Sequence, residues 1–145
     1  MASLQIKFMR LHPDAKLPTW GTPLAAGIDL YADHDLSLAP GAYGLVGTGL
    51  AIELPPGYEG QVRPRSGWSL KKGVTVLNSP ATIDEDYRGE VLIILINHGP
   101  SIVDIKKGDR ICQLLLRPVY RFEVSVVTEL SPSDRGTSGF GSTGS

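Results

Sequence analysis

The spacing of glycine and proline is the feature that most constrains what this chain can fold into. The sequence contains 17 glycines and 11 prolines among 145 residues, and the longest stretch without either spans residues 119–131. Both residues interrupt helices, so coiled coils, helical bundles and βαβ repeats are excluded. The length is typical of one domain, and a hydrophobic content of 41% excludes a wholly disordered chain.

The segments between these interruptions have the periodicity of short strands. Apolar and polar residues alternate over residues 4–8 and 120–126, which predicts strands with one buried face. Residues 91–97 and 110–116 are more continuously apolar, which predicts strands buried on both faces. Further strands are expected at residues 28–32, 43–53, 58–63, 74–77 and 101–105. The pattern predicts an all-β sandwich, jelly roll or barrel.

One short helix and one tail complete the expected organisation. Ser66 can cap a helix that Gly73 ends. The last ten residues are Gly, Ser or Thr except for Phe140, and such a segment cannot bury enough apolar surface to order itself. We therefore expect a β domain over residues 1–131 and a flexible tail over residues 132–145.

Charge and hydropathy exclude several classes of function. The formal net charge of −1 provides no global basic field for holding nucleic acid or an anionic membrane. Cys112 is the single cysteine, so no internal disulfide can form. The longest strictly apolar run has six residues, against roughly 18 in a spanning helix, and the N-terminal residues carry charges where a signal peptide would be apolar. We expect a soluble, cytoplasmic protein.

The tail contains groups that suit a nucleotide. Residues 139–144 match the GxGxxG pattern, but a dinucleotide site needs a strand before the motif and a helix after it. Arg135 stands at the base of the tail, where a guanidinium beside free backbone N–H groups can bind phosphate. Phe140 is an isolated aromatic ring that can stack on a base. The alternative is a flexible end without function.

Two loops carry groups that could take part in chemistry. One can bind an anion, and the other can supply a general base. Arg65, Ser66 and Gly67 offer a guanidinium, a hydroxyl and a backbone N–H at the start of the expected helix, where an anion is favoured; a capped turn with solvated arginines is the alternative. Asp84 lies in an acidic loop beside the apolar Ile83, which can hold it rigidly enough to act as a base. Acidic loops are otherwise solvated surface.

Polar residues near these loops suggest specific partners. The amide of Asn78 can both donate and accept hydrogen bonds, as recognition of a pyrimidine edge requires. Asp29 lies between apolar neighbours, which indicates a partner rather than free solvation. Arg110 and Gln113 lie in an expected buried strand, so they also need partners.

Taken together and in order, these segments resemble the five motifs of the homotrimeric dUTPases, the deoxyuridine triphosphate nucleotidohydrolases. The resemblance extends from Ala26 to Gly144, and its most specific parts are Pro64-Arg65-Ser66-Gly67, residues 83–89 (IDEDYRG) and the tail from Arg135. It implies a distorted β jelly roll, of the β-clip type, with one short helix. It also implies a homotrimer whose active sites draw motifs from all three subunits, with the tail arriving from the third.

The resemblance implies a role for each matching residue. Asp84 would orient and deprotonate the attacking water, and Tyr87 would lie under the deoxyribose and exclude a 2′-hydroxyl. Asn78, with backbone groups near Thr82 and Ile83, would read uracil from a tight β-hairpin. The implied phosphate contacts are Arg65, Ser66, Gly67 and Gln113. In the tail, Arg135 would reach the γ-phosphate, Phe140 would cover the uracil, and Gly141 and Ser142 would also bind substrate.

The resemblance also implies a supporting shell and a cofactor. Asp29 and Arg110 would support the site, and Mg²⁺ would be held through the triphosphate and waters, with Asp29 as a possible outer ligand. The implied reaction is hydrolysis of dUTP to dUMP and pyrophosphate, which keeps uracil out of DNA and supplies dUMP for thymidylate synthesis. No direct binding of nucleic acid or membrane is expected.

The sequence departs from the family's pattern at a few positions, and two other functions are alternatives to the hydrolase. Trp68-Ser69, Ala81 and Cys112 differ from the residues common in the family, and none of them removes a group that the reaction needs. A dCTP deaminase shares the implied fold, but it needs a glutamate-based proton shuttle in the pyrimidine pocket. A silent regulatory trimer that only senses nucleotides is the other alternative, and it has no reason to retain Asp84, Tyr87 and Arg135 together.

Overall fold

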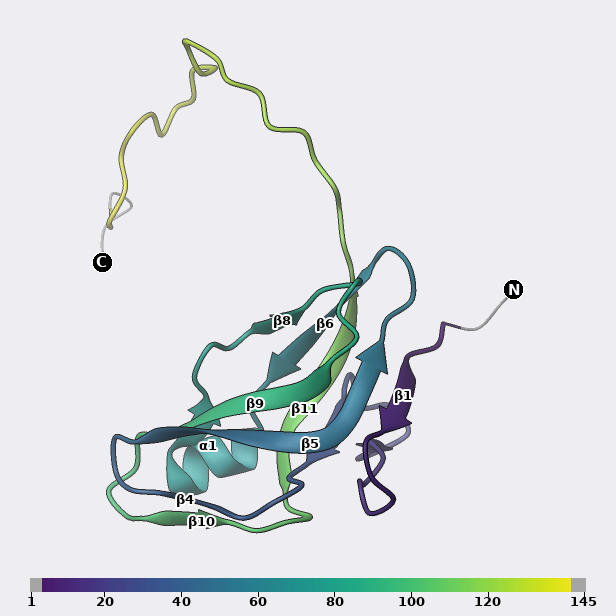
Figure 1. Cartoon of the computed structure of the whole chain (residues 1–145). Coiled ribbons are helices and arrows are strands. Elements are labelled where there is room, and N and C mark those ends of the chain that lie inside the picture. Colours follow the sequence, from purple (N-terminus) through teal and green to yellow (C-terminus); the bar gives the residue numbers. More distant parts are fainter. Residues whose placement is uncertain (1–3, 142–145) are drawn as a thin grey trace.

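The computed structural model describes residues 4–141, which contain eleven strands and one helix (Figure 1). The elements are β1 (Lys7–Arg10), β2 (Thr19–Trp20), β3 (Ile28–Tyr31), β4 (Leu36–Leu38), β5 (Tyr43–Glu53), β6 (Tyr58–Arg63), α1 (Ser66–Lys72), β7 (Val74–Val76), β8 (Ala81–Ile83), β9 (Glu90–Asn97), β10 (Val103–Ile105) and β11 (Arg110–Pro118). β3, β7, β9, β10 and β11 begin and end within two residues of the expected bounds. β1 begins three residues later than the strand expected at residues 4–8, and β2, β4 and β8 were not expected. The expected bounds of β5 and β6 are confirmed.

Two antiparallel sheets enclose the core. One sheet has the strand order β1-β5-β9-β7, the other has the order β2-β3-β11-β6-β8, and β4 pairs with β10 in a small ribbon. The inward residues of both sheets form one apolar cluster, and its fully buried members include Leu30, Val46, Ile93, Leu95, Ile105, Ile111 and Leu114. The single chain therefore closes a jelly-roll-like body around a continuous core.

The sheet of β5 and β9 has an open apolar face. β9 was expected to be buried on both faces, and this is wrong for the single chain, because its side chains alternate between buried and partly exposed. Leu92 is 45% exposed, and on β5 Tyr43 and Leu45 are 67% and 52% exposed. Their strands pair in register, so these side chains form an apolar surface that nothing in the described chain covers.

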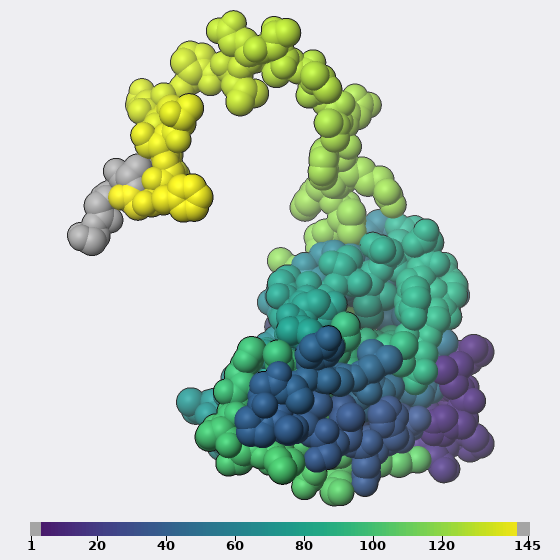
Figure 2. Space-filling model, turned by 60° about the vertical axis from the view of Figure 1, so that its left-hand side comes forward, coloured from purple at the N-terminus to yellow at the C-terminus, as the bar shows by residue number. Residues whose placement is uncertain are grey.

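Residues 120–126 form no strand, and the expectation of a half-buried strand there is wrong. Tyr120, Phe122 and Val126 are 85%, 84% and 97% exposed. The pairs of β11 with β3 end at Leu114, and its pairs with β6 end at Pro118 opposite Tyr58, where β6 begins, so no strand of the described chain continues alongside the following residues. We call residues 119–141 the C-terminal arm. It leaves the body and stands clear of it (Figures 1 and 2).

Helix α1 begins one residue earlier than expected. Arg65, in extended backbone, occupies the N-cap position without a side-chain cap hydrogen bond, so the expected cap by Ser66 is wrong. Gly73 ends the helix as predicted, with a φ of 70° and its N–H donating to Ser69 O over 3.1 Å. The seven residues of α1 thus place Arg65, Ser66 and Gly67 in one turn after β6.

The described residues include no helix that is long and apolar enough to span a membrane.

Candidate functional site

A pocket of about 320 Å³ gathers most of the residues predicted to bind phosphate. We call it the basic pocket, and its lining is Gly21, Thr22, Ala25, Asp29, Arg65, Ser66, Gly67, Arg110 and Gln113. Pairing of β3 with β11 places Asp29 opposite Gln113, and pairing of β11 with β6 places Arg63 opposite the same residue. Because β6 leads directly into α1, the sheet carries the turn at Arg65 to the side of Asp29.

Asp29 organises the charges of the basic pocket. Its side chain is only 6% exposed, with Arg110 Nη1 at 3.4 Å from Oδ2 and Arg65 Nε at 3.8 Å from Oδ1. Arg65 Nη1 also donates to Arg110 O over 3.1 Å. A buried carboxylate therefore orients two guanidinium groups, whose remaining donors are available to an anion. This confirms that Asp29 has specific partners.

One oxygen of Asp29 lacks a donor. Within residues 4–141, Oδ1 is the one buried side-chain nitrogen or oxygen without a hydrogen-bond partner. Such atoms are costly to leave unpaired. The nearest cationic atom recorded for Oδ1 is Arg65 Nε at 3.8 Å, which is too far for a hydrogen bond.

A second pocket, of about 170 Å³, holds the residue predicted to act as the general base and several of those predicted to contact the deoxyribose and the uracil. We call it the Tyr87 pocket, and its lining is Thr82, Ile83, Asp84, Tyr87, Glu90, Val91 and Leu92. Ile83 packs against the core, so it holds the adjacent Asp84 as expected. The Tyr87 N–H donates to Asp84 O over 3.1 Å, which closes the turn after β8. Asp84 and Tyr87 therefore share one hydrogen-bonded turn and one pocket.

Asp84 also borders a third hollow, at the root of the C-terminal arm. Its lining, which we call the acidic pocket, is Glu59, Asp84, Glu85, Asp86, Val119 and Arg121. Arg121 Nη2 lies 3.8 Å from Glu85 Oε2, and the Val119 N–H donates to Gly57 O over 2.9 Å. The arm therefore begins beside the loop that carries Asp84.

The expected hairpin around Asn78 is wrong. β7 pairs with β9 in one sheet, whereas β8 pairs with β6 in the other, so residues 77–80 form a turn that crosses between the sheets. Asn78 is exposed in this turn, while Thr82 and Ile83 line the Tyr87 pocket. The two strands look adjacent in the sequence because their connection is short, and only long-range pairing separates them.

The tail residues lie apart from both pockets. Arg135 Nε donates to Ser138 O over 2.8 Å within the arm itself, and Phe140 is fully exposed. Figure 2 shows this part of the arm held away from the body. Gly141 ends the described chain, and Ser142 lies outside the described residues. The predicted site of one chain is thus divided among the basic pocket, the Tyr87 pocket and the arm.

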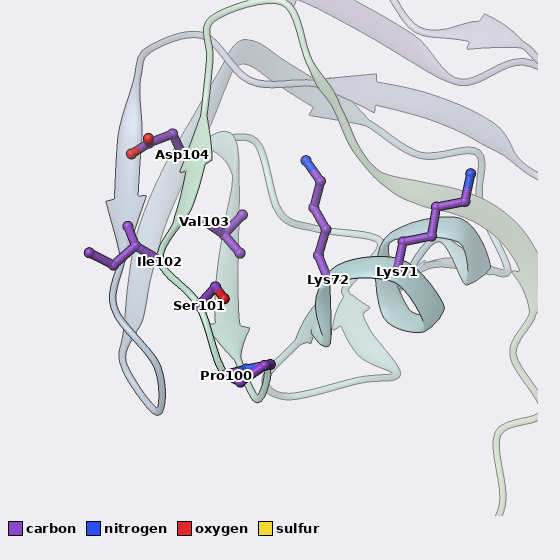
Figure 3. A pocket seen from close by; sticks show the side chains of 7 residues that line it. All are labelled: Lys71, Lys72, Pro100, Ser101, Ile102, Val103 and Asp104. Atoms are coloured by element: carbon purple, nitrogen blue, oxygen red, sulfur yellow. The ribbon is translucent and has the colours of Figure 1, made fainter.

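The structure adds residues that the sequence analysis did not single out. Thr22 enters the basic pocket from the loop between β2 and β3, and Glu90 enters the Tyr87 pocket at the start of β9. Glu90 directly follows the acidic loop of Asp84, and that adjacency was its only signal in the sequence. A further hollow between α1 and β10, lined by Lys71, Lys72 and residues 100–104, contains none of the predicted residues (Figure 3).

Comparison with known proteins identifies the family. The family model described as dUTPase matches residues 13–144. The chain belongs to the dUTPase family. It is 55% identical over 132 residues to the deoxyuridine 5′-triphosphate nucleotidohydrolase of Anaeromyxobacter sp. strain Fw109-5, covering 91% of this chain and 90% of that protein. With the protein of the same name from Syntrophotalea carbinolica it is 51% identical over 146 residues, covering 99% of both chains.

Solved structures agree with this membership of the dUTPase family. The dUTPase of Staphylococcus bacteriophage 80alpha, solved with dUPNHPP, superposes with a TM-score of 0.88 at 27% sequence identity. The match covers 97% of this chain and 99% of the phage chain. The prediction of an all-β, jelly-roll-like fold with one short helix is confirmed.

Proposed function

We propose that this chain is a dUTP diphosphatase, which hydrolyses dUTP to dUMP and pyrophosphate by in-line attack of water on the α-phosphorus. The observation that carries the proposal is the pair of pockets, one with two guanidinium groups beside a buried carboxylate and one with a carboxylate beside an aromatic ring. The basic pocket suits a triphosphate. The Tyr87 pocket suits the nucleoside and the water that attacks the α-phosphorus. The names of the similar enzymes support the same substrate.

Asp84 is the base in this mechanism. Its carboxylate would accept a proton from the water as the oxygen attacks phosphorus, and pyrophosphate would leave from the opposite side. Ile83, which precedes Asp84, packs against the core, and the Tyr87 N–H donates to the Asp84 carbonyl. These two contacts hold the loop, so the Asp84 carboxylate would need little reorganisation during the reaction. Tyr87 would lie under the deoxyribose, and Thr82 and Ile83 would contact the uracil edge from within the pocket. Asn78 would have to reach the same edge from the exposed turn that precedes β8.

The basic pocket would stabilise the phosphates. Charge grows on the leaving pyrophosphate during the reaction. The donors of Arg65 and Gln113, the hydroxyl of Ser66 and the backbone N–H of Gly67 would surround it, since all four residues line the basic pocket. Arg110, paired with Asp29, supports this arrangement. From the arm, Arg135 would reach the γ-phosphate, Phe140 would cover the base, and Gly141 and Ser142 would complete the contacts.

The basic pocket fits a magnesium ion held through the substrate. The unpaired Oδ1 of Asp29 is a hard oxygen acceptor within the pocket, and Mg²⁺ prefers oxygen ligands while retaining several waters. Asp29 would therefore accept hydrogen bonds from waters of the ion rather than bind it alone. When bound, the ion would neutralise charge on the triphosphate.

The proposed assembly is a homotrimer with shared sites. The apolar surface of Tyr43, Leu45 and Leu92 is open in the single chain, and Leu92 also lines the Tyr87 pocket. Another copy covering this face would bury apolar area and bring a second chain to the edge of the pocket. Each site would then combine the Tyr87 pocket of one copy, the basic pocket of another and the arm of a third.

This reaction would keep uracil out of DNA and provide dUMP for thymidylate synthesis. We propose that the enzyme acts in the cytoplasm on free nucleotide, without binding nucleic acid or membrane directly. The net charge of −1 supports this, because charge-driven binding to a polyanion needs an excess of Lys and Arg.

The decisive experiment measures products from dUTP and from its competitors. Purified protein with Mg²⁺ should release one pyrophosphate for each dUMP formed from dUTP, and much less from UTP or dTTP. Incubation with dCTP should release no ammonia, which separates the hydrolase from a deaminase. Nucleotide binding without pyrophosphate release would overturn the proposal in favour of a regulatory protein.

A further inference from the structure

Glu90 occupies a point where the backbone ladder between β5 and β9 is interrupted. The partner register changes from Gly47 opposite Leu92 to Ala51 opposite Glu90, so a bulge occupies the intervening residues of β5. Side chains span this gap. Glu90 Oε1 accepts the N–H of Gly49 over 2.8 Å, and Thr48 Oγ1 donates to Val91 O over 2.8 Å.

The bulge allows little freedom in the backbone conformation at Gly49. Gly49 has a φ of 68°, and a Cβ there would lie 2.8 Å from His12 Nε2 and 3.0 Å from Asp33 Cγ. Its N–H is therefore held in one direction, toward the Glu90 carboxylate. The start of β9 is tied to the body through this side chain as well as through the backbone.

The carbonyl of Glu90 holds the ring of Tyr87. The Tyr87 hydroxyl donates to Glu90 O over 2.7 Å. The ring lies so close over Gly89 that a Cβ at that position would be 2.5 Å from the Tyr87 oxygen. The orientation of the ring therefore depends on where the first residue of β9 stands.

We propose that Glu90 is a positioning residue for selection of the sugar. Its carboxylate anchors the start of β9 to the bulge of β5, and its carbonyl then fixes the face of Tyr87 that would contact deoxyribose. Glu90 also borders the pocket that contains Asp84 and Tyr87. This inference rests on the proposed function, because it assumes that Tyr87 excludes the 2′-hydroxyl.

The test compares kcat/KM for dUTP and UTP in variants of Glu90. Glu90→Ala should lower the preference for dUTP about tenfold or more, since a small displacement of a positioning group has large kinetic effects. Glu90→Gln should keep the wild-type preference, because an amide oxygen can still accept the Gly49 N–H. Glu53→Ala is the matched control: Glu53 lies at the end of β5 and pairs with the exposed Lys7, so its removal should leave the preference unchanged.

Two further variants keep the inference testable. Glu90→Asp retains the charge but is one methylene shorter, so it should also lose preference and can replace Glu90→Ala if that variant does not fold. Tyr87→Phe removes the hydroxyl that binds Glu90 O, and the double variant with Glu90→Ala should lose little more preference than either single variant.

The outcomes separate this inference from the proposed function. Folded Glu90→Ala or Glu90→Asp protein with the wild-type preference for dUTP would overturn the positioning role while leaving the hydrolase intact. Loss of preference in Glu90→Gln as large as in Glu90→Ala would also overturn it, because the hydrogen bond would then not be the cause. Wild-type protein that does not hydrolyse dUTP would instead defeat the proposed function.

Discussion

At the scale of single residues, the chemistry depends on which carboxylate stands beside which neighbour. Asp29 is buried between two arginines, whereas Asp84 is exposed at a pocket edge with its loop held by Ile83. The carboxylate of Asp29 is committed to its two arginines, whereas an open carboxylate beside the substrate can contact an attacking water. The two residues therefore have different proposed roles although both are aspartates.

Asp84→Asn should keep dUTP binding and lose kcat by roughly two to four orders of magnitude, because general base catalysis contributes about that much. Single-turnover kinetics together with a binding measurement would check this. Asp86→Asn is the control, since Asp86 lies on the same loop but lines the acidic pocket instead. Near-normal turnover in Asp84→Asn would reassign the base.

Cys112 should make stability fall at alkaline pH. Burial raises the pKa of its thiol far above the ordinary value of 9.0, and the charge of Asp29 raises the pKa further while Arg65 opposes the shift. The unfolded thiol ionises above about pH 9 whereas the folded one stays neutral, so stability is fully present below that pH and is lost as the pH rises. Relative to Cys112→Ala, the free energy of unfolding should decrease by about 1 kcal/mol from pH 9 to pH 10.

Denaturant unfolding of both proteins at each pH measures this difference. The comparison with Cys112→Ala removes the contribution of other groups that titrate in the same range. A difference that does not change with pH would show that the thiol ionises equally in the folded and unfolded states.

At the scale of elements, the C-terminal arm and helix α1 have different tasks. The arm contributes nothing to the core, because its apolar side chains are exposed in the described chain. The helix, in contrast, sits between β6 and β7 and packs Trp68 partly against the core. Loss of the arm should therefore affect activity, and disturbance of the helix should affect stability.

Removal of residues 136–145 should leave a folded, assembled protein whose hydrolysis of dUTP is strongly reduced. The truncation deletes Phe140 and the glycine-rich end but no residue of either sheet. Circular dichroism and size-exclusion chromatography would check the fold and assembly, and pyrophosphate release would check activity. Normal turnover by the truncated protein would refute closure of the arm over the site.

Gly73→Ala should destabilise the fold by about 1–3 kcal/mol. Its φ of 70° costs an alanine roughly 1–2 kcal/mol, and a Cβ there would lie 2.6 Å from the backbone nitrogen of Gly99. Gly41→Ala is the matched control, because Gly41 has a similar φ of 77° with no atom within 4 Å of its Cβ position. Chemical denaturation of both variants should show the larger loss for Gly73, and equal losses would exclude the contact with Gly99.

At the scale of the whole molecule, the predicted site is divided between separate parts of one chain. Arg65 and Asp84 line different pockets, and Phe140, on the arm, is fully exposed and lines neither of them. The open apolar face of β5 and β9 adjoins the Tyr87 pocket through Leu92. An assembly that covers this face is the simplest way to bring the groups together.

Mixing two inactive variants should restore activity if the sites are shared. Asp84→Asn and Arg65→Ala should each be nearly inactive alone. In randomly mixed trimers about a quarter of the sites would combine an intact Asp84 with an intact Arg65 from another copy. Co-refolding of the two variants followed by the pyrophosphate assay measures this, and a mixture no more active than its components would place both residues in one chain's site.

The sequence predicted the longest strands because local patterning decides them, but it missed the short strands β2, β4 and β8. Turn residues mark the two ends of β5 and of β6, and Gly73 ends α1. These boundaries follow from conformational preferences that act over a few residues. The same patterning failed at residues 120–126, where alternation indicates a strand but the described residues include no partner strand for it. A strand needs a neighbour, and local sequence does not contain that information.

By itself, the sequence determined the family, the all-β fold class and the residues able to perform the chemistry, since these follow from side-chain types in a fixed order. Only the tertiary structure decided which of them meet. Pairing of β3 with β11 brings Asp29 to Arg110, and placement of β7 and β8 in different sheets turns the expected hairpin into a crossing. The bulge in β5 likewise assigns Glu90 a partner. Such contacts join residues far apart in the chain, so they depend on packing of the whole core rather than on local preference.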